Sequence, residues 1–142
     1  MTLQLILFLN SVWFALGFHL FALRSQIFGK ILVPKEERDT PVFDKLKATG
    51  PFLGGFNLAF CILNFWILTD TSVFPEMNQR LKLLVVFAIA HGTQFAGNVP
   101  IALQNLKGKG VWQVKGLMRF IFITDFTLMI SNLVLAIMYI SL

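Results

Sequence analysis

The chain has 142 residues, of which 56% are hydrophobic and 13% charged, and its formal net charge is +5. A soluble domain has about 45–50% apolar and about 25% charged residues, so the shortage of charge excludes an ordinary water-soluble domain. The single cysteine, Cys61, excludes an internal disulfide and hence a small secreted disulfide scaffold. No zinc-protease, phosphate-loop or nucleophile–base motif occurs. We predict an all-α membrane protein.

The first apolar run covers about residues 3–23, and a helix needs about 20 residues to cross a bilayer. A secretory signal peptide is the alternative interpretation. However, no positive charge precedes the run, the run is longer than the usual apolar core of a signal peptide, and no A-x-A cleavage site follows it. We therefore predict a helix that is retained in the mature protein.

Three further runs qualify as spanning helices, at about residues 51–68, 83–103 and 120–140. Gly50-Pro51 marks the start of the second, because proline suits the first turn of a helix. The predicted fold is a four-transmembrane-helix bundle that forms a single domain over residues 1–142.

The connection between the first two spans has its own helical signal. Thr40-Pro41 resembles an N-cap followed by proline at the first helical position. The following segment VFDKLKAT is predicted to form a short amphipathic helix of one or two turns on the cytoplasmic surface. The mixed-charge segment LVPKEERDTP before it is predicted to be a linker.

The basic residues are distributed unevenly between the connections. Ten lie in the first and third connections together and two, Arg80 and Lys82, in the second. The positive-inside rule then predicts that the first and third connections are cytoplasmic and that both termini lie outside. The net charge is explained by this topology and by contact with anionic lipid. Nucleic-acid binding is the weaker interpretation of the same lysines, so no nucleic-acid partner is expected.

Polar side chains recur inside the spans at a spacing of seven residues, which brings them to nearly the same face of a helix. The pairs are Asn57 with Asn64, His91 with Asn98 (and Gln94 beside them), and Asp125 with Asn132.

At about 1.5 Å per residue, these side chains fall into two layers. The layer nearer the cytoplasm contains His19, Asn57, Asn98 and Asp125, and the second contains Asn64, His91 and Asn132. Asn10 has a suitable depth but is nine residues from His19, about 180° around the helix. It is therefore left out of the site, or Ser11 takes its place. Trp13 lies mid-span and is expected to pack between helices.

The polar groups are expected to face the interior of the bundle. A lone aspartate at the centre of a bilayer costs about 2.5–3.5 kcal/mol on insertion scales, and lipid offers amides no hydrogen-bond partners. Inside the bundle, Asp125 can pair with His19 and the asparagines. One interpretation is structural, because interhelical hydrogen bonds set helix register. The other is a binding site, since an ionisable residue inside a membrane is a functional candidate. The candidate ligand-binding residues are Asp125, His19, Asn57, Asn98, His91, Gln94, Asn64 and Asn132.

Two intramembrane histidines raise the question of haem. Two histidines that ligate one iron must lie at one level, whereas His19 and His91 differ in depth by roughly 12 Å. This argues against a haem held by both in one chain, while ligation by one histidine or in an oligomer stays open. The donors show no ligand-spacing motif, so neither a metal site nor a catalytic residue is predicted, and the cofactor is unknown.

Glycine and proline mark two packing features. Gly50 and Gly54 form a G-x-x-x-G pattern, which we interpret as a close helix contact within the bundle rather than a dimer interface. Gly92, Gly97 and Pro100 are expected to loosen or kink the third span, since proline removes a backbone hydrogen bond.

The segment LVPKEERDTPVFDKLKATGPFLGGFNLAF, residues 32–60, resembles the join between helices 1 and 2 in small bacterial four-helix membrane proteins of the BphX-like or DoxX-like kind. It covers about a fifth of the chain. The resemblance implies a four-helix bundle in a bacterial inner membrane. It implies no activity and no catalytic residue.

The favoured function is non-enzymatic: the polar cluster binds a small or amphipathic ligand, or a partner membrane subunit. One alternative is a membrane oxidoreductase subunit in which Asp125, His19 and His91 hydrogen-bond a quinone or ligate haem. Another is a proton- or cation-coupled transporter that uses Asp125 and acts as a homo-oligomer.

Overall fold

The computed structural model describes residues 2–140, with the backbone alone for Thr71, and in this range the chain contains helices and no strand. The long helices are α1 (Leu3–Phe18), α3 (Pro41–Thr69), α4 (Met77–Asn105) and α5 (Leu117–Ile140). The shorter elements are a π-helical segment (His19–Leu23) that continues α1, the helix α2 (Ser25–Leu32), and two 3-10 turns (Lys35–Glu37 and Thr71–Val73).

Four helical segments are long and apolar enough to cross a membrane, which confirms the prediction of four candidate spans and suggests an integral membrane protein. They are Leu3–Leu23, Pro41–Thr69, Met77–Asn105 and Leu117–Ile140. Large apolar side chains on their outer faces are exposed, such as Phe8, Phe65 and Ile137. Such faces suit lipid, because acyl chains are as apolar as these side chains.

The second long helix begins ten residues earlier than predicted. Thr40 is indeed an N-cap, since its side-chain oxygen accepts from the backbone N–H of Phe43. However, the helix continues through Pro51 to Thr69 without interruption, so the prediction of a separate short helix at residues 42–49 was wrong. The buried Phe43 ring anchors the first turns of α3 against Gly29 of α2. Pro51 removes one backbone hydrogen bond within α3 but does not end the helix.

A short helix does lie between the first two spans, but it is α2. Its buried residues are Phe28 and Gly29, of which Gly29 lies against Phe43 and Lys47 of α3, whereas Gln26 and Lys30 are exposed. The edge contact between the rings of Phe28 and Phe21, with centroids 4.9 Å apart, holds α2 against the π-helical segment. A short helix between the first two spans is thus present, but it is formed by residues 25–32 and not by the predicted residues.

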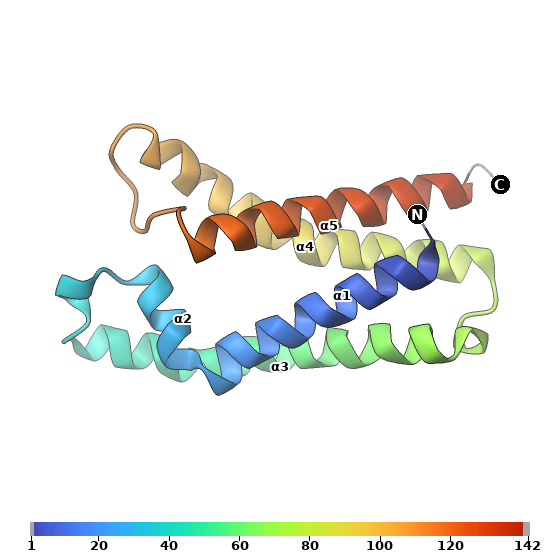
Figure 1. Cartoon of the computed structure of the whole chain (residues 1–142), viewed down its shortest axis with the longest axis horizontal. Coiled ribbons are helices and arrows are strands. Elements are labelled where there is room, and N and C mark those ends of the chain that lie inside the picture. The colour runs from blue at the N-terminus through green and yellow to red at the C-terminus, as the bar shows by residue number, and fades with distance from the viewer. Residues whose placement is uncertain (1, 141–142) are drawn as a thin grey trace.

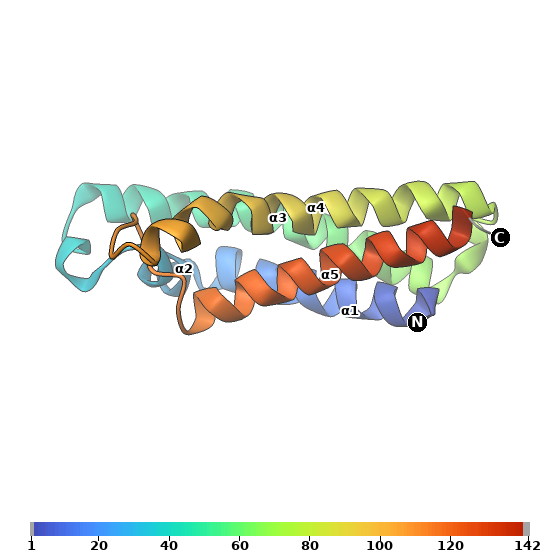
Figure 2. The same cartoon turned by 90° about the horizontal axis from the view of Figure 1, so that it is seen from above.

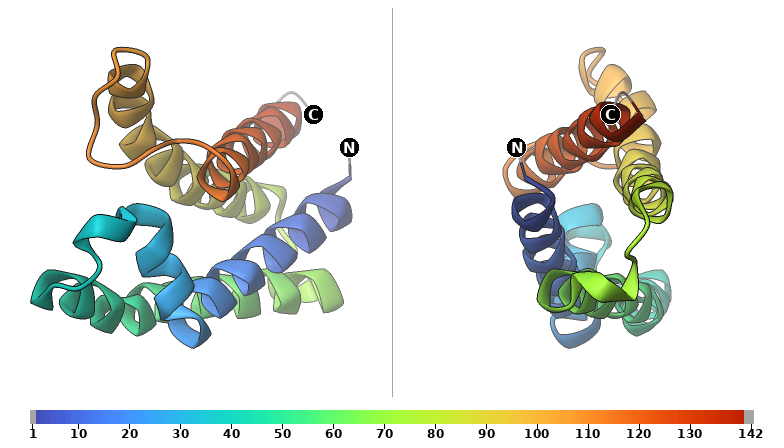
Figure 3. Two further views of the ribbon diagram at one scale, coloured as in Figure 1. Left: turned by 60° about the vertical axis from the view of Figure 1, so that its left-hand side comes forward. Right: turned by 90° about the vertical axis from the view of Figure 1, so that its right-hand side faces the viewer.

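The bundle consists of two helix pairs, with α1 packed on α3 and α4 packed on α5. Figure 1 shows both termini at one end, together with the α3–α4 connection. The other two connections lie together at the opposite end, as Figure 2 also shows. The left view of Figure 3 shows the α4–α5 pair lying above the α1–α3 pair. The first and third connections therefore lie at the same end of the bundle, as the prediction of four spans requires.

The apolar core fills the end of the bundle near the termini. It includes Ile6 and Leu7 of α1, Ile67 of α3, Phe87 of α4 and Leu135 of α5, all at most 3% exposed. Polar side chains occupy the middle of the bundle. At the end that carries the two longer connections, cavities lie between the helix pairs.

Small residues allow α1 and α3 to approach closely. A Cβ added at Gly54 would lie 2.5 Å from the Cβ of Ala22, and one added at Gly50 would overlap the carbonyl oxygen of Phe21. Ala22 and Phe21 belong to the π-helical segment, whose wider turn presses the backbone against α3. The predicted close contact at Gly50 and Gly54 is thus confirmed within one chain.

α4 remains a continuous helix through Gly92, Gly97 and Pro100. Its last turns bend away from the α1–α3 pair, which is visible in Figure 1 as the rise of its C-terminal part. Pro100 lies in these turns and cannot donate a backbone hydrogen bond, so the expected loosening of this span fits the shape of α4.

Candidate functional site

The centre of the bundle contains a pair of amides that joins its first and last helices. Asn10 of α1 donates from Nδ2 to Oδ1 of Asn132 of α5, and Asn132 donates back to Oδ1 of Asn10, each over 3.1 Å. Asn132 Nδ2 also donates to the backbone carbonyl of Leu128 over 2.8 Å. Both amides are 0% exposed. Each amide thus gives the other a hydrogen-bond partner that lipid could not supply.

His91 of α4 connects this pair to the carboxylate of Asp125. Its Nε2 lies 3.2 Å from Oδ1 of Asn10, and its Nδ1 lies 3.3 Å from Oδ1 of Asp125. The imidazole stacks on the ring of Phe14, with centroids 4.8 Å apart and planes 17° from parallel. Both ring nitrogens are therefore engaged and the ring plane is held by packing.

The hydrogen bonds determine where the histidine carries its proton. The carbonyl of Leu128 can only accept, so the group that faces it must be the NH₂ of Asn132. Asn132 Nδ2 then also donates to Asn10, which makes Oδ1 of Asn10 the atom that faces the histidine. Since that oxygen can only accept, Nε2 of His91 carries a proton.

A second proton is shared between His91 and Asp125. With Nε2 protonated, a bond between Nδ1 of His91 and Oδ1 of Asp125 needs one proton between them. That proton resides either on the imidazole, giving an ion pair, or on the carboxyl, giving a neutral pair. In both cases His91 and Asp125 together have no net charge, which suits a fully buried position.

One oxygen of Asp125 is satisfied and the other is not. Oδ1 accepts from the indole N–H of Trp13 over 2.8 Å, besides its contact with His91. Oδ2 is buried and has no hydrogen-bond partner among residues 2–140. A buried carboxyl oxygen without a partner is costly, and this atom belongs to a residue that borders a cavity.

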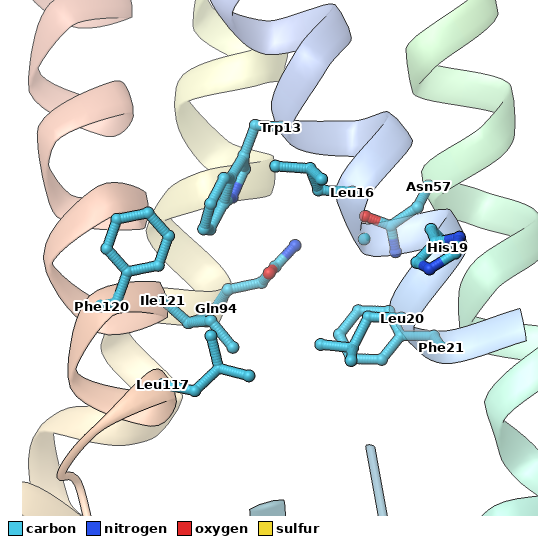
Figure 4. A pocket seen from close by; sticks show the side chains of 11 residues that line it. Trp13, Leu16, His19, Leu20, Phe21, Asn57, Gln94, Leu117, Phe120 and Ile121 are labelled. Atoms are coloured by element: carbon cyan, nitrogen blue, oxygen red, sulfur yellow. The ribbon is translucent and has the colours of Figure 1, made fainter. Parts of the chain in front are cut away.

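Two adjoining cavities lie between the helix pairs. The first, of about 280 Å³, is lined by α1 and α5 residues such as Leu16 and Phe120 (Figure 4). The second, of about 340 Å³, extends beneath α2 and the α4–α5 connection and reaches Asp125. Both cavities share the lining residues Leu20, Phe21, Asn57, Gln94 and Ile121.

The cavities are mostly apolar, with a few polar groups. Figure 4 shows the side chains of Trp13, Gln94 and Asn57 around the first cavity, with Gln94 extending from the α4 side. His19 and Asp125 are the titratable residues in the two linings. Small-molecule sites have about this size, roughly 300–1,000 Å³, and this mixture of an apolar wall with few polar groups.

The predicted site residues separate into three groups. Asp125, His91 and Asn132 belong to the hydrogen-bond network. Asn57, Gln94, Asn98 and His19 line the cavities. Asn64 belongs to neither group: it is fully buried, donates to the carbonyl of Phe60, and its Oδ1 has no partner among the described residues.

Two expectations about the first helix were wrong. Asn10, which we left out of the site, is at the centre of the hydrogen-bond network, whereas His19 is exposed on the π-helical segment at the cavity wall. The estimate that Asn10 and His19 point in different directions holds, but the inward face is that of Asn10. The expected partner of Asp125 is accordingly replaced: His91 and Trp13 contact its carboxyl instead of His19. Ser11 is buried but donates to its own helix, at Leu7.

Asp125 and His91 were predicted to lie in different layers, but their side chains are in contact. The two predicted layers are therefore not separate. The depth estimate took the ends of the apolar runs as a common level. In fact α4 extends to Asn105 and bends, while α5 begins at Leu117. The two helices are thus offset along their lengths, which places His91 beside Asp125.

The α4–α5 connection contributes a tryptophan to the site. Trp112 donates from Nε1 to Oδ1 of Asn98 over 3.2 Å and lines the second cavity. Asn105 holds the connection in place, since its amide donates to the carbonyls of Lys109 and Trp112 and accepts from the N–H of Val114. The position of Trp112 in the sequence gives no sign of its contact with Asn98.

No group of three or more histidine, cysteine, aspartate or glutamate side chains within residues 2–140 is arranged to hold a metal ion. Both nitrogens of His91 are already engaged, so a haem iron would have to displace either Asn10 or Asp125. Comparison with known protein families, with curated proteins and with solved structures finds no match for this chain.

Proposed function

We propose that this protein binds a small amphipathic molecule in the paired cavities between the α1–α3 and α4–α5 pairs. The observation that carries the proposal is the Oδ2 atom of Asp125, which is buried and unpartnered in a residue that lines an apolar cavity. Because Oδ2 itself is buried in this structure, a shift of the neighbouring side chains would let the polar head of a ligand reach this oxygen while its apolar body follows the cavity walls.

The hydrogen-bond network around Asp125 supports a role in binding a ligand, in addition to setting the register of the helices. Trp13 and His91 hold the carboxyl from two helices, and Phe14 holds the imidazole. A group fixed in this way keeps its free oxygen in one place, which is the preorganisation that a binding site needs. A purely structural network would be expected to use both oxygens of its only buried carboxylate.

We further propose that the chain lies in a bacterial inner membrane with both termini on the outer side. The basic residues of the first and third connections support this orientation, and the resemblance of residues 32–60 supports the location. In this orientation the cavities lie in the cytoplasmic half of the bundle. The same lysines offer contacts for anionic lipid.

Native mass spectrometry of the gently purified protein tests the binding role. We expect a copurifying small molecule in the wild-type protein and its loss in Ile121→Trp, which fills space shared by both cavities. The matched control is Ile123→Trp, on the same helix but with an exposed side chain that lines neither cavity. Equal occupancy in both variants and the wild type, or no bound molecule in any of them, would refute the proposal.

A further inference from the structure

We infer that the head group of the ligand is an uncharged hydroxyl, as in a long-chain alcohol or an alkylphenol, that donates a hydrogen bond to Oδ2 of Asp125. This inference rests on the proposed function and adds the chemical class of the ligand. It follows from the hydrogen-bond chain that begins at the carbonyl of Leu128 and ends at Asp125.

The first step concerns the direction of the missing hydrogen bond. The shared proton lies between His91 and Oδ1 of Asp125, and Oδ1 also accepts from Trp13. Oδ2 is thus left as an acceptor in either position of that proton. Its partner must be a donor. The oxygen of an ether, an ester or a quinone can only accept, so two acceptors would face each other and both would lack a hydrogen-bond donor.

The second step concerns charge. His91 and Asp125 together are already neutral, and neither cavity lining contains a lysine, arginine or glutamate. His19 is the other titratable lining residue, and it lies in the first cavity, whereas Asp125 borders the second. An ammonium head group would therefore leave an uncompensated charge in an apolar site, unless the shared proton left the protein. An anionic head group would face a carboxyl oxygen. An uncharged donor avoids both penalties.

The third step concerns the apolar part of the ligand. Beyond Asp125 the second cavity is walled by Phe28, Leu53 and Met118 and joins the first cavity at Ile121. The first cavity lies between α1 and α5, which contact each other much less than either contacts its own pair. A single alkyl chain can follow this path, and the sparse contact between α1 and α5 is where we expect a ligand from the bilayer to enter.

Fluorescence quenching with matched brominated chains tests the inference. The variant Trp66→Phe removes an exposed tryptophan and leaves Trp13 and Trp112, which each line one of the cavities. The protein is reconstituted in phosphatidylcholine vesicles, and four probes are compared at equal membrane concentration. They are 12-bromododecanol, its methyl ether, 12-bromododecylammonium and 12-bromododecanoate. A brominated alkylphenol and its methyl ether form a second pair that distinguishes aromatic from aliphatic hydroxyls.

We expect each hydroxyl probe to bind at least about tenfold more tightly than its methyl ether, the effect of one good hydrogen bond. In Asp125→Asn this preference should fall to within about twofold, because an amide at this position presents a donor as well as an acceptor. Ile123→Ala in the same background is the matched control: its exposed side chain lines neither cavity and the carboxyl network stays intact, so the preference should persist.

The possible failures are distinguishable. Equal binding of alcohol and ether would refute the hydroxyl inference but leave the proposed cavity occupied. Tightest binding of the ammonium probe, with release of a proton, would also refute it and would indicate cation exchange at Asp125. The proposed function itself fails only if the native mass spectra of Ile121→Trp and Ile123→Trp are alike.

Discussion

Asn10 and Asn132 exchange two hydrogen bonds across the bundle and thereby join α1 to α5, two helices that otherwise touch little. Asn10 also accepts from His91, so its amide joins three helices. We expect Asn10→Ala to lower the free energy of unfolding by about 1–2 kcal/mol, because it leaves buried groups on Asn132 and His91 without partners. Denaturation in mixed micelles measures the effect. Gln4→Ala, at an exposed position of the same helix, should be neutral, and an equally small change in Asn10→Ala would contradict the network.

The proton on His91 is open to direct observation. The hydrogen bonds require Nε2 to be protonated, since its partner, Oδ1 of Asn10, can only accept. Solid-state NMR of ¹⁵N-histidine-labelled protein in lipid should show a protonated Nε2 for His91. Replacing Asn10 with alanine should change this signal and leave that of the exposed His19 as it was. A signal from an unprotonated Nε2 in the native protein would overturn the proton assignment and with it the argument for an uncharged donor.

The contact between Gly54 and Ala22 predicts a strong effect from a single methyl group. Gly54→Ala would bring its Cβ to 2.5 Å from the Cβ of Ala22, so α1 and α3 would have to separate. Such overpacking typically destabilises by about 1–3 kcal/mol, and the melting temperature in detergent should fall. Gly55→Ala is the matched control, because no atom lies within 4 Å of its added Cβ and alanine favours the helix. Equal melting temperatures of the two variants would show that the close contact is absent.

The α3–α4 connection contains a carboxylate whose titration can be followed outside the spans. Hydrogen bonds from the hydroxyl and the backbone N–H of Ser72 lower the pKa of Asp70. Because the folded pKa is the lower one, this contribution to stability is present above the unfolded pKa and is lost as the pH falls through the folded value. Ser72→Ala should therefore raise the pKa of Asp70, as measured by carboxyl NMR. An unchanged titration would show that the hydroxyl does not contribute.

The orientation in the membrane can be tested with the same connections. Cys61→Ala removes the only cysteine, and new cysteines are then placed at Ser72 and at Lys107. We expect an impermeant thiol reagent added outside intact cells to label the first and not the second, because the basic connections are retained on the cytoplasmic side. The reverse labelling pattern would place the termini in the cytoplasm and invert the proposed topology.

The sequence by itself determined the class of architecture. Spanning helices are set by local apolar length, because every backbone group in lipid must be satisfied within its own helix. Four runs of that length predicted the four spans, and Thr40 predicted the true start of α3 even though Pro51 was taken for the start of the span. The polar residues His91, Asp125 and Asn132 were likewise identified from their chemistry, since such groups avoid lipid.

Only the tertiary structure decided which of these residues meet. In a soluble helix the apolar face is buried and the polar face meets water, so the sequence shows which side is inside. The first span is apolar on nearly all of its faces, so the sequence could not show whether Asn10 or His19 points into the bundle. The pairing of His91 with Asp125 depends on how far α4 is offset from α5, which the bend in α4 and the connection between the helices set. The free oxygen of Asp125 and the cavities beside it arise from packing between segments distant in the chain, and no local pattern records such contacts.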